Sequence, residues 1–199
     1  MSVTTIVETV DRAPLENYGV FENEYHLAIA RLEPENNIEM VLDGFMAADS
    51  RKTFCVVGNH KTRYGGYLKN KYRDPRIKYL GGIYNLPAVN ALRHFSALYF
   101  HGHSVGGTNP SLLDAMANGA SICAHDNVFN RSVLGDDAFY FSSAADVAGC
   151  IANEGPNKER SARFAENNLN KIRTVYSWER VSDAYEELFR RILGERKGA

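Results

Sequence analysis

The sequence predicts an α/β fold: a doubly wound parallel sheet of about six strands, with helices on both faces and a helical C-terminal tail. Three observations favour this fold. Short apolar runs typical of buried strands recur along the chain, and helical patterns lie between them. After residue 144 only helical patterns follow. Because strand and helix alternate strictly, the strands should pair in parallel through right-handed crossovers, which gives a Rossmann-like sheet.

The predicted elements follow one another in a simple order. The strands are YHLAIAR (25–31), TFCVVGN (53–59), RIKYLG (76–81), ALYFHG (97–102), ASICAHD (120–126) and AFYFS (138–142). The helices with clear patterns are 36–48, 86–95 and 110–118, followed in the tail by 144–153, 157–173 and 178–193. Residues 1–24 have little continuous period, so we expect a linker or a displaced terminal segment before one domain over 25–199.

Composition excludes several classes of protein. Lys and Arg number 23 against 24 Asp and Glu, and this balance argues against broad attraction to nucleic acid or to an anionic membrane surface. No apolar run is long enough to span a bilayer, and the N-terminus lacks the pattern of a signal peptide. The three cysteines lie in apolar runs and are expected to be reduced thiols. These features predict a cytoplasmic protein.

Several polar residues and glycines follow the predicted strands at the point where each strand ends. In an open parallel sheet a ligand binds beyond the carboxyl ends of the strands. Arg31 ends the first strand, Asn59 the second, and Gly82 and Ile83 follow the third. The Arg31 guanidinium is expected to face this crevice and to clamp a diphosphate. The alternative is a surface arginine that pairs with a glutamate of the following loop, LEPENN.

The stretch HGHSVGGTNPSLLDAM, 101–116, is the clearest candidate for a ligand loop. Gly106 and Gly107 lack Cβ atoms, so their backbone can receive a bulky anion closely. Thr108 or Asn109 can cap the helix that begins at the following proline, and this is expected to leave free N–H donors for a phosphate.

One turn into that helix, Asp114 is placed to accept hydrogen bonds from sugar hydroxyls. Together with the glycine loop it describes a cradle for a nucleotide sugar or a dinucleotide. The alternative is that the two glycines only shape a tight loop and that Asp114 complements the helix dipole.

The two histidines of this stretch are His101 and His103. A zinc site is one interpretation, but no Cys, Asp or Glu at metal-ligand spacing accompanies them. A hydrogen-bonding role in the ligand loop is favoured. The sequence therefore predicts no metal and no cofactor.

Taken together, ARLEPENN, VVGN, RIKYLG and the glycine loop followed by PSLLDAMANG resemble the C-terminal, donor-binding domain of group 1 (family 4-like) retaining glycosyltransferases of the two-domain GT-B fold. The resemblance covers 25–141 well and the tail loosely. HGHSVGGTNPSLLDAMANG with AHDNVFNR is similar, more narrowly, to bacterial rhamnosyltransferases of surface-glycan synthesis. That likeness implies dTDP-rhamnose as the donor.

The resemblance assigns roles to several residues. Arg31 and His103 would act at the reaction centre, and Arg31 would also bind the diphosphate. Backbone groups near Ile83 and Tyr84 would hold the base, the loop 106–109 would meet the diphosphate and donor sugar, and Asp114 would bind the sugar of the nucleotide. The chain departs from the family at three places. Gly106 replaces the first of two glutamates, Asp114 replaces the second, and Asn36 or Asn37 stands where a lysine is common.

The function implied is retaining transfer of a sugar from a nucleoside diphosphate, a substrate, to a glycan or a lipid-linked acceptor. The resemblance also implies an N-terminal acceptor domain of the same polypeptide, little activity for this chain alone, and possible peripheral membrane association of the whole enzyme. Three alternatives remain: a non-catalytic nucleotide-binding or scaffold domain, a sugar-nucleotide epimerase, and an α/β interaction domain without a phosphate site. The epimerase would usually need carboxylates in the loop where Gly106 lies.

Overall fold

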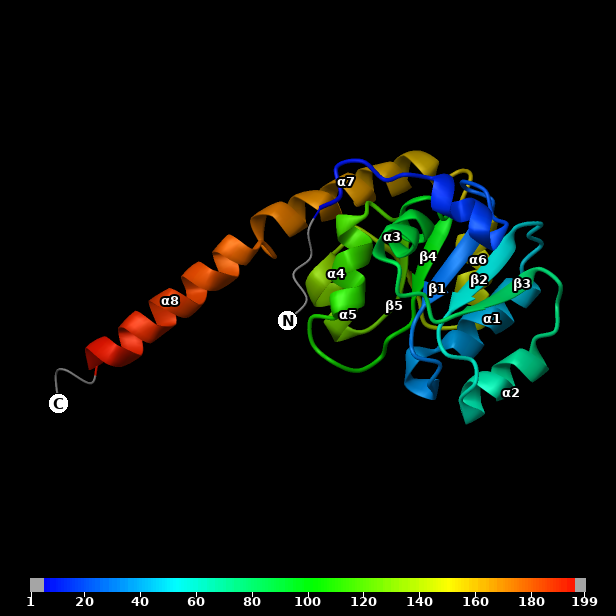
Figure 1. Cartoon of the computed structure of the whole chain (residues 1–199), viewed down its shortest axis with the longest axis horizontal. Helices are drawn as coiled ribbons and strands as arrows, with labels where there is room; N and C mark the ends of the chain where they lie inside the picture. Colours follow the sequence, from blue (N-terminus) through cyan, green and yellow to red (C-terminus); the bar gives the residue numbers. More distant parts are fainter. Residues whose placement is uncertain (1–5, 196–199) are drawn as a thin grey trace.

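The computed structural model describes residues 6–195 and confirms the predicted fold class (Figure 1). Six strands form one all-parallel sheet in the order β3-β2-β1-β4-β5-β6. The strands are β1 Tyr25–Ile29, β2 Thr53–Val57, β3 Ile77–Gly81, β4 Leu98–His101, β5 Ile122–His125 and β6 Phe139–Phe141. Each of the predicted strand runs contains one of them.

Helices cover both faces of the sheet, and each face has its own core. On one face lie α1 Ile38–Ala47, α2 Arg63–Lys71 and α6 Ala144–Ala152. On the other lie α3 Leu86–His94, α4 Pro110–Ala117, α5 Val128–Leu134 and α7 Lys158–Thr174. Successive residues of a strand alternate between the cores: Leu27 of β1 belongs to the second and Ala28 to the first. This is why the strand runs are apolar throughout.

The chain changes direction across the sheet between β1 and β4. From β1 it passes through β2 to β3 at one edge, and α3 then returns it to the middle, where β4 pairs with the free side of β1. The loops after β1 and β4 consequently lead to helices on opposite faces, α1 and α4. A doubly wound sheet opens a crevice at such a switch point.

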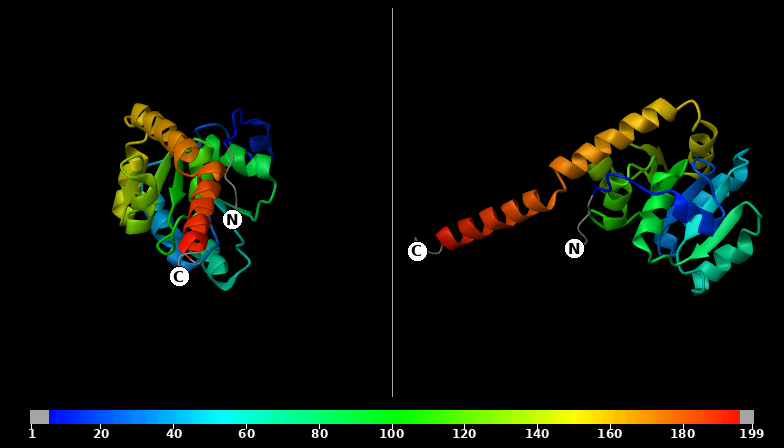
Figure 2. Two further views of the ribbon diagram at one scale, coloured as in Figure 1. Left: turned by 90° about the vertical axis from the view of Figure 1, so that its left-hand side faces the viewer. Right: turned by 45° about the horizontal axis from the view of Figure 1, so that its top comes forward.

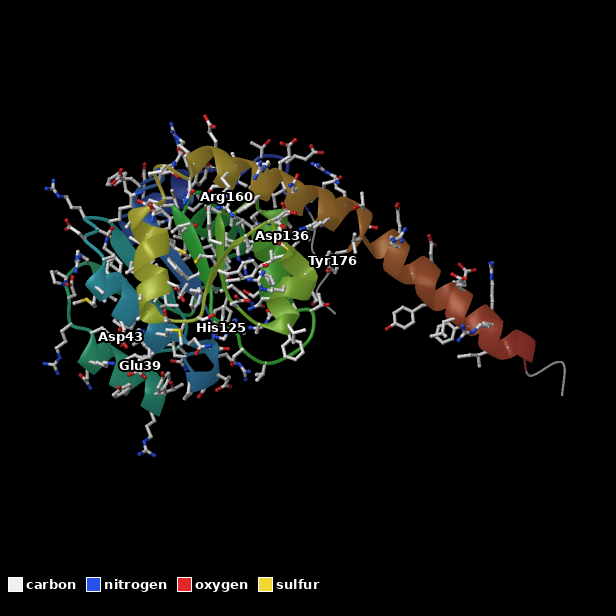
Figure 3. All side chains as sticks on the ribbon, turned by 180° about the vertical axis from the view of Figure 1, so that it is seen from behind. Glu39, Asp43, His125, Asp136, Arg160 and Tyr176 are labelled. Carbon is white, nitrogen blue, oxygen red and sulfur yellow. The ribbon has the colours of Figure 1, made fainter. Side chains whose placement is uncertain are left out.

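Figure 3 looks onto the face that carries α1, α2 and α6. Glu39 and Asp43 of α1 face α2, where the Lys71 Nζ lies 2.7 Å from Glu39 Oε1 and 3.3 Å from Asp43 Oδ1. The Tyr67 hydroxyl also donates to Glu39, at 2.5 Å. Hydrogen bonds from Lys71 and Tyr67 lower the pKa of Glu39. These contacts fix α2, and with it the loop that connects β2 to α2.

The N-terminal segment packs on the α3 side of the sheet. Residues Ala13–Tyr18 form a 3-10 helix, and Leu15 and Val20 are buried in the core. Residues 1–5 of the segment lie outside the described residues.

The tail leaves the domain after α7. Asn168 of α7 is buried and donates to the Asp137 carbonyl at 2.8 Å, and Lys171 pairs with the Asp137 carboxylate at 2.6 Å. α8, Trp178–Glu195, then projects away from the sheet (Figure 2). Its described large apolar side chains are 41% to 62% exposed: Tyr185, Leu188, Phe189, Ile192 and Leu193. Within residues 6–195, no helix has the length and apolar character needed to cross a membrane.

Candidate functional site

A crevice of about 520 Å³ lies at the carboxyl ends of β1, β2, β3 and β4, at the switch point of the sheet. It brings together six of the residues that the sequence analysis selected: Arg31, Asn59, Gly82, Ile83, Tyr84 and His103. They come from four loops that are distant in sequence. The remaining selected residues, Gly106, Gly107, Thr108, Asn109 and Asp114, do not line it.

Hydrogen bonds hold together the two loops that carry Arg31 and His103 and form the floor of the crevice. The buried Asn36 donates its side-chain amide to the Arg31 carbonyl at 2.8 Å, and Asn37 donates to the Gly102 carbonyl at 2.8 Å. From the other loop, the Ser104 hydroxyl donates to the Glu35 carbonyl at 2.7 Å. Of the two residues that stand in place of a lysine, Asn36 therefore braces the Arg31 loop itself, and Asn37 joins that loop to the His103 loop.

Arg31 is exposed and lines the crevice. Across the described chain, no carboxylate lies within ion-pair distance of its guanidinium, so the interpretation of a surface arginine paired with a nearby glutamate is wrong for residues 6–195. A guanidinium with five free N–H donors is suited to a bidentate contact with a phosphate.

His101 and His103 form a stacked pair, with ring centroids 4.4 Å apart and an interplanar angle of 15°. Burial lowers the pKa of both rings. The neighbouring His103 lowers that of His101 further, and the charge of Arg31 does the same for His103. Both are therefore neutral at pH 7 and carry one donor and one acceptor nitrogen each. The Nδ1 of His103 is buried and has no hydrogen-bond partner in the described chain.

The glycine loop lies beside the crevice and is open to solvent. A Cβ added at Gly106 or Gly107 would meet no other atom within 4 Å. Gly106 has φ +111°, a conformation that other residues rarely adopt, so this position needs glycine for its backbone shape. Among residues 6–195, the N–H groups of Gly106 and Gly107 have no acceptor. They are available to an anion, as expected.

The start of α4 confirms the predicted cap at Asn109, with Pro110 as the first helical residue, but differs from the prediction in its amides. Asn109 is the N-cap, and its side chain accepts from the Ser111 N–H at 2.9 Å. The Asn109 carbonyl accepts from the N–H groups of Leu112 and Leu113, at 3.0 and 3.1 Å. Pro110 has no N–H, and the N–H groups of the next three residues are all bonded to Asn109. The first turn of α4 therefore has no free amide among the described residues. The prediction of free amide donors is wrong here because the cap and the following turn use them.

Asp114 does not line the crevice, where we expected it, and Ser111 does. The Asp114 carboxylate pairs with Arg93 of α3 at 3.3 Å and is one-third exposed, outside the crevice lining. Ser111, which the sequence analysis did not select, lines the crevice. No sequence signal marks Ser111 or Arg93, because their meeting depends on how α3 packs beside α4.

A second hollow, of about 370 Å³, lies at the opposite edge of the sheet, near the amino ends of the strands. Its lining includes Lys52 and Glu154, which already pair with each other at 2.6 Å. Within the described chain, no group of three or more His, Cys, Asp or Glu side chains could hold a metal ion.

No family model and no curated protein matches the sequence. Solved structures do share its fold. HepE of Anabaena in complex with UDP and glucose is 17% identical, with a TM-score of 0.77 over 88% of this chain and 50% of HepE. The C-terminal domain of LpcC, a glycosyl transferase group 1 family protein of Francisella tularensis, is 15% identical, with a TM-score of 0.72 over 88% of this chain and 97% of that domain.

Sucrose-phosphate synthase of Thermosynechococcus elongatus is 14% identical, with a TM-score of 0.78 over 97% of this chain and 50% of the synthase. At these identities the likeness shows the fold. The neighbours include glycosyltransferases, in agreement with the resemblance seen in the sequence. The chain spans about half the length of HepE and of the synthase.

Proposed function

We propose that this chain is the donor-binding domain of a retaining glycosyltransferase, and that the crevice binds a nucleoside diphosphate sugar. The observation that carries the proposal is the exposed, unpaired Arg31 guanidinium at the switch point of the sheet, beside the neutral His103. Structures of the same fold have been solved with UDP and with UDP-glucose. A doubly wound sheet binds its ligand at this edge.

The proposed ligand extends across the crevice. The base lies at Gly82, Ile83 and Tyr84, next to Asn59. Tyr84 is 95% exposed and offers its ring to a base.

The diphosphate lies between Arg31 and the free N–H groups of the loop 106–109, which includes Thr108 and Asn109. The reaction needs the negative charge of the departing diphosphate to be stabilised, and Arg31 supplies a positive charge for it. His103, being neutral, donates or accepts one hydrogen bond near the donor sugar.

The sequence stretch HGHSVGGTNPSLLDAMANG supports a narrower proposal, in which the donor is dTDP-rhamnose and the acceptor is a surface glycan or a lipid-linked glycan. Transfer would also require a second, acceptor-binding domain of the whole enzyme, so this chain alone is proposed to bind donor with little turnover. No metal ion takes part in the proposed step.

Titration calorimetry with dTDP, UDP and GDP tests the proposal. At least one of them should bind, and Arg31→Gln should weaken binding by about 10- to 100-fold, the usual loss for a hydrogen bond to a charged group. Arg180→Gln, at an exposed arginine of α8, is the matched control and should bind as the wild type does. Absence of binding to all three nucleotides at millimolar concentration overturns the proposal.

A further inference from the structure

Two of the three cysteines meet in the core on the α6 side of the sheet. Cys123 of β5 is 0% exposed, and Cys150 of α6 packs against the same core and is partly exposed. A hydrogen bond joins the two thiols. All three cysteines of the chain are free thiols in the structure. The fold therefore brings two reduced sulfur atoms from different elements into contact.

The elements around Cys150 hold it beside Cys123. The Cys150 thiol donates to the Tyr140 carbonyl of β6 at 3.9 Å. Tyr140 is the strand partner of Ala124, the residue that follows Cys123 on β5. Val147, one turn before Cys150 on α6, is buried in the same core. Since both the helix and the strand are held by this packing, the two thiols stay in contact without a covalent bond.

The two thiols differ in acidity and in access to solvent. The hydrogen bond with Cys123 lowers the pKa of Cys150, although burial and the Asp146 carboxylate act in the opposite direction. Burial, together with the contact to Cys150, raises the pKa of Cys123 well above its ordinary value. The thiolate is the reactive form of cysteine, and an accessible thiol of lowered pKa beside a second cysteine is typical of redox-sensitive pairs. Cys150 is therefore the thiol that reacts first.

We propose that Cys150 and Cys123 are a modification site, a dithiol that a peroxide oxidises reversibly to a disulfide between α6 and β5. Cys150 is the attacking thiol and Cys123 the resolving thiol. The proposal stands apart from the proposed function, because neither cysteine is among the described residues that line the crevice.

The oxidation takes two steps, and hydrogen peroxide supplies the oxidant. In the first, the Cys150 sulfur attacks one peroxide oxygen, the O–O bond breaks, and the thiol proton leaves with the second oxygen as water, which gives a sulfenic acid. In the second, the Cys123 sulfur attacks the Cys150 sulfur, the S–O bond breaks, and the Cys123 proton leaves with that oxygen as water. Two thiols are oxidised to one disulfide, and one peroxide is reduced to two waters.

The third cysteine of the chain provides a matched control. Cys55 of β2 lies in the core on the opposite face, so the sheet separates it from the pair. Burial raises the pKa of Cys55 to about 12, and its side chain is 0% exposed. Cys55 should therefore remain a thiol while the pair is oxidised.

Peptide mapping of the whole chain after exposure to hydrogen peroxide tests the proposal. Trypsin cleaves after Arg131, so it separates Cys123 from Cys150 unless a disulfide joins them, and it leaves Cys55 in a third peptide. The wild type should lose about 2 Da, the mass of two hydrogens, and should yield a Cys123–Cys150 linked peptide. Dithiothreitol should restore the original mass.

Three variants assign the roles. Cys55→Ala should form the same linked peptide as the wild type, and Cys150→Ser should form none. Cys123→Ala removes the resolving thiol, so Cys150 should remain a sulfenic acid that dimedone traps. Melting temperatures of the reduced proteins establish that the variants are folded, and if Cys123→Ala does not fold, the wild-type peptide map decides the linkage.

Several results would overturn the proposal. One is the absence of a linked peptide in the oxidised wild type while all three thiols still react with iodoacetamide. Another is a disulfide that contains Cys55 or that joins two chains. A third is oxidation of Cys150 to a sulfinic acid with no linked peptide, since Cys123 would then fail to resolve the sulfenic acid.

Discussion

Gly102→Ala tests whether the Arg31 loop and the His103 loop are in the close contact that forms the floor of the crevice. Gly102 follows β4, and a Cβ placed there would lie well within the van der Waals contact distance of the Asn36 carbonyl oxygen, 3.0 Å from the carbonyl carbon and 3.4 Å from the Asn37 Cβ. The nearest atoms belong to backbone, which cannot rotate away as a flexible side chain would. The two loops must therefore separate to admit one methyl group.

The expected loss of stability has two parts. Overpacking at a closely packed position costs about 1–3 kcal/mol. Separation of the loops also stretches the bond from Asn37 to the Gly102 carbonyl, 2.8 Å long, and a hydrogen bond contributes about 1 kcal/mol. The free energy of unfolding should fall by about 2–4 kcal/mol, and the melting temperature by about 4–16 °C for a chain of this size.

Urea unfolding, followed by circular dichroism, measures this loss. Gly107→Ala, five residues along the same loop, is the control. Its Cβ would meet nothing within 4 Å, so its stability should stay within about 0.5 kcal/mol of the wild type. If Gly102→Ala is as stable as Gly107→Ala, the loops do not approach each other as described and the geometry of the crevice floor is wrong.

Three further predictions concern other parts of the chain. Gly106→Ala should lower the free energy of unfolding by about 1–3 kcal/mol because of its φ of +111°, although its Cβ has open space around it; equal stability in urea unfolding would contradict this. Asn168→Ala should lower the free energy of unfolding by about 1–3 kcal/mol and increase amide exchange in α7, because the Asp137 carbonyl loses the hydrogen bond that the buried Asn168 side chain donates to it. Burial lowers the pKa of His26 to about 3, so the unfolded chain takes up a proton near pH 6.5 that the folded chain does not. Stability should therefore be full above about pH 6.5 and decline as the pH falls toward about 3, and His26→Leu should make this decline shallower; an unchanged slope in His26→Leu would contradict the assignment.

Much of the site could be predicted from the sequence because of one property of parallel sheets. The carboxyl ends of all strands lie at one edge, so residues that follow strands converge there whatever their separation in sequence. Arg31, Asn59, Gly82 and His103 were selected on that ground, and all of them line the crevice. The position of Asp114 was predicted from its spacing along the helix. That spacing gives the turn of α4 on which Asp114 lies, but not its ion-pair partner Arg93, which comes from α3.

The sequence by itself determined the class of fold, the order of its elements and the loops that meet at the crevice, because hydrophobic period and strand ends are local properties of the chain. The tertiary structure decided which hydrogen-bonding groups in those loops remain free. The amides that begin α4 are used by the Asn109 cap and carbonyl, and the Ser111 hydroxyl contacts Arg93 and Tyr99. Those two side chains come from α3 and β4, and only the packing of these elements against α4 brings them to one serine oxygen.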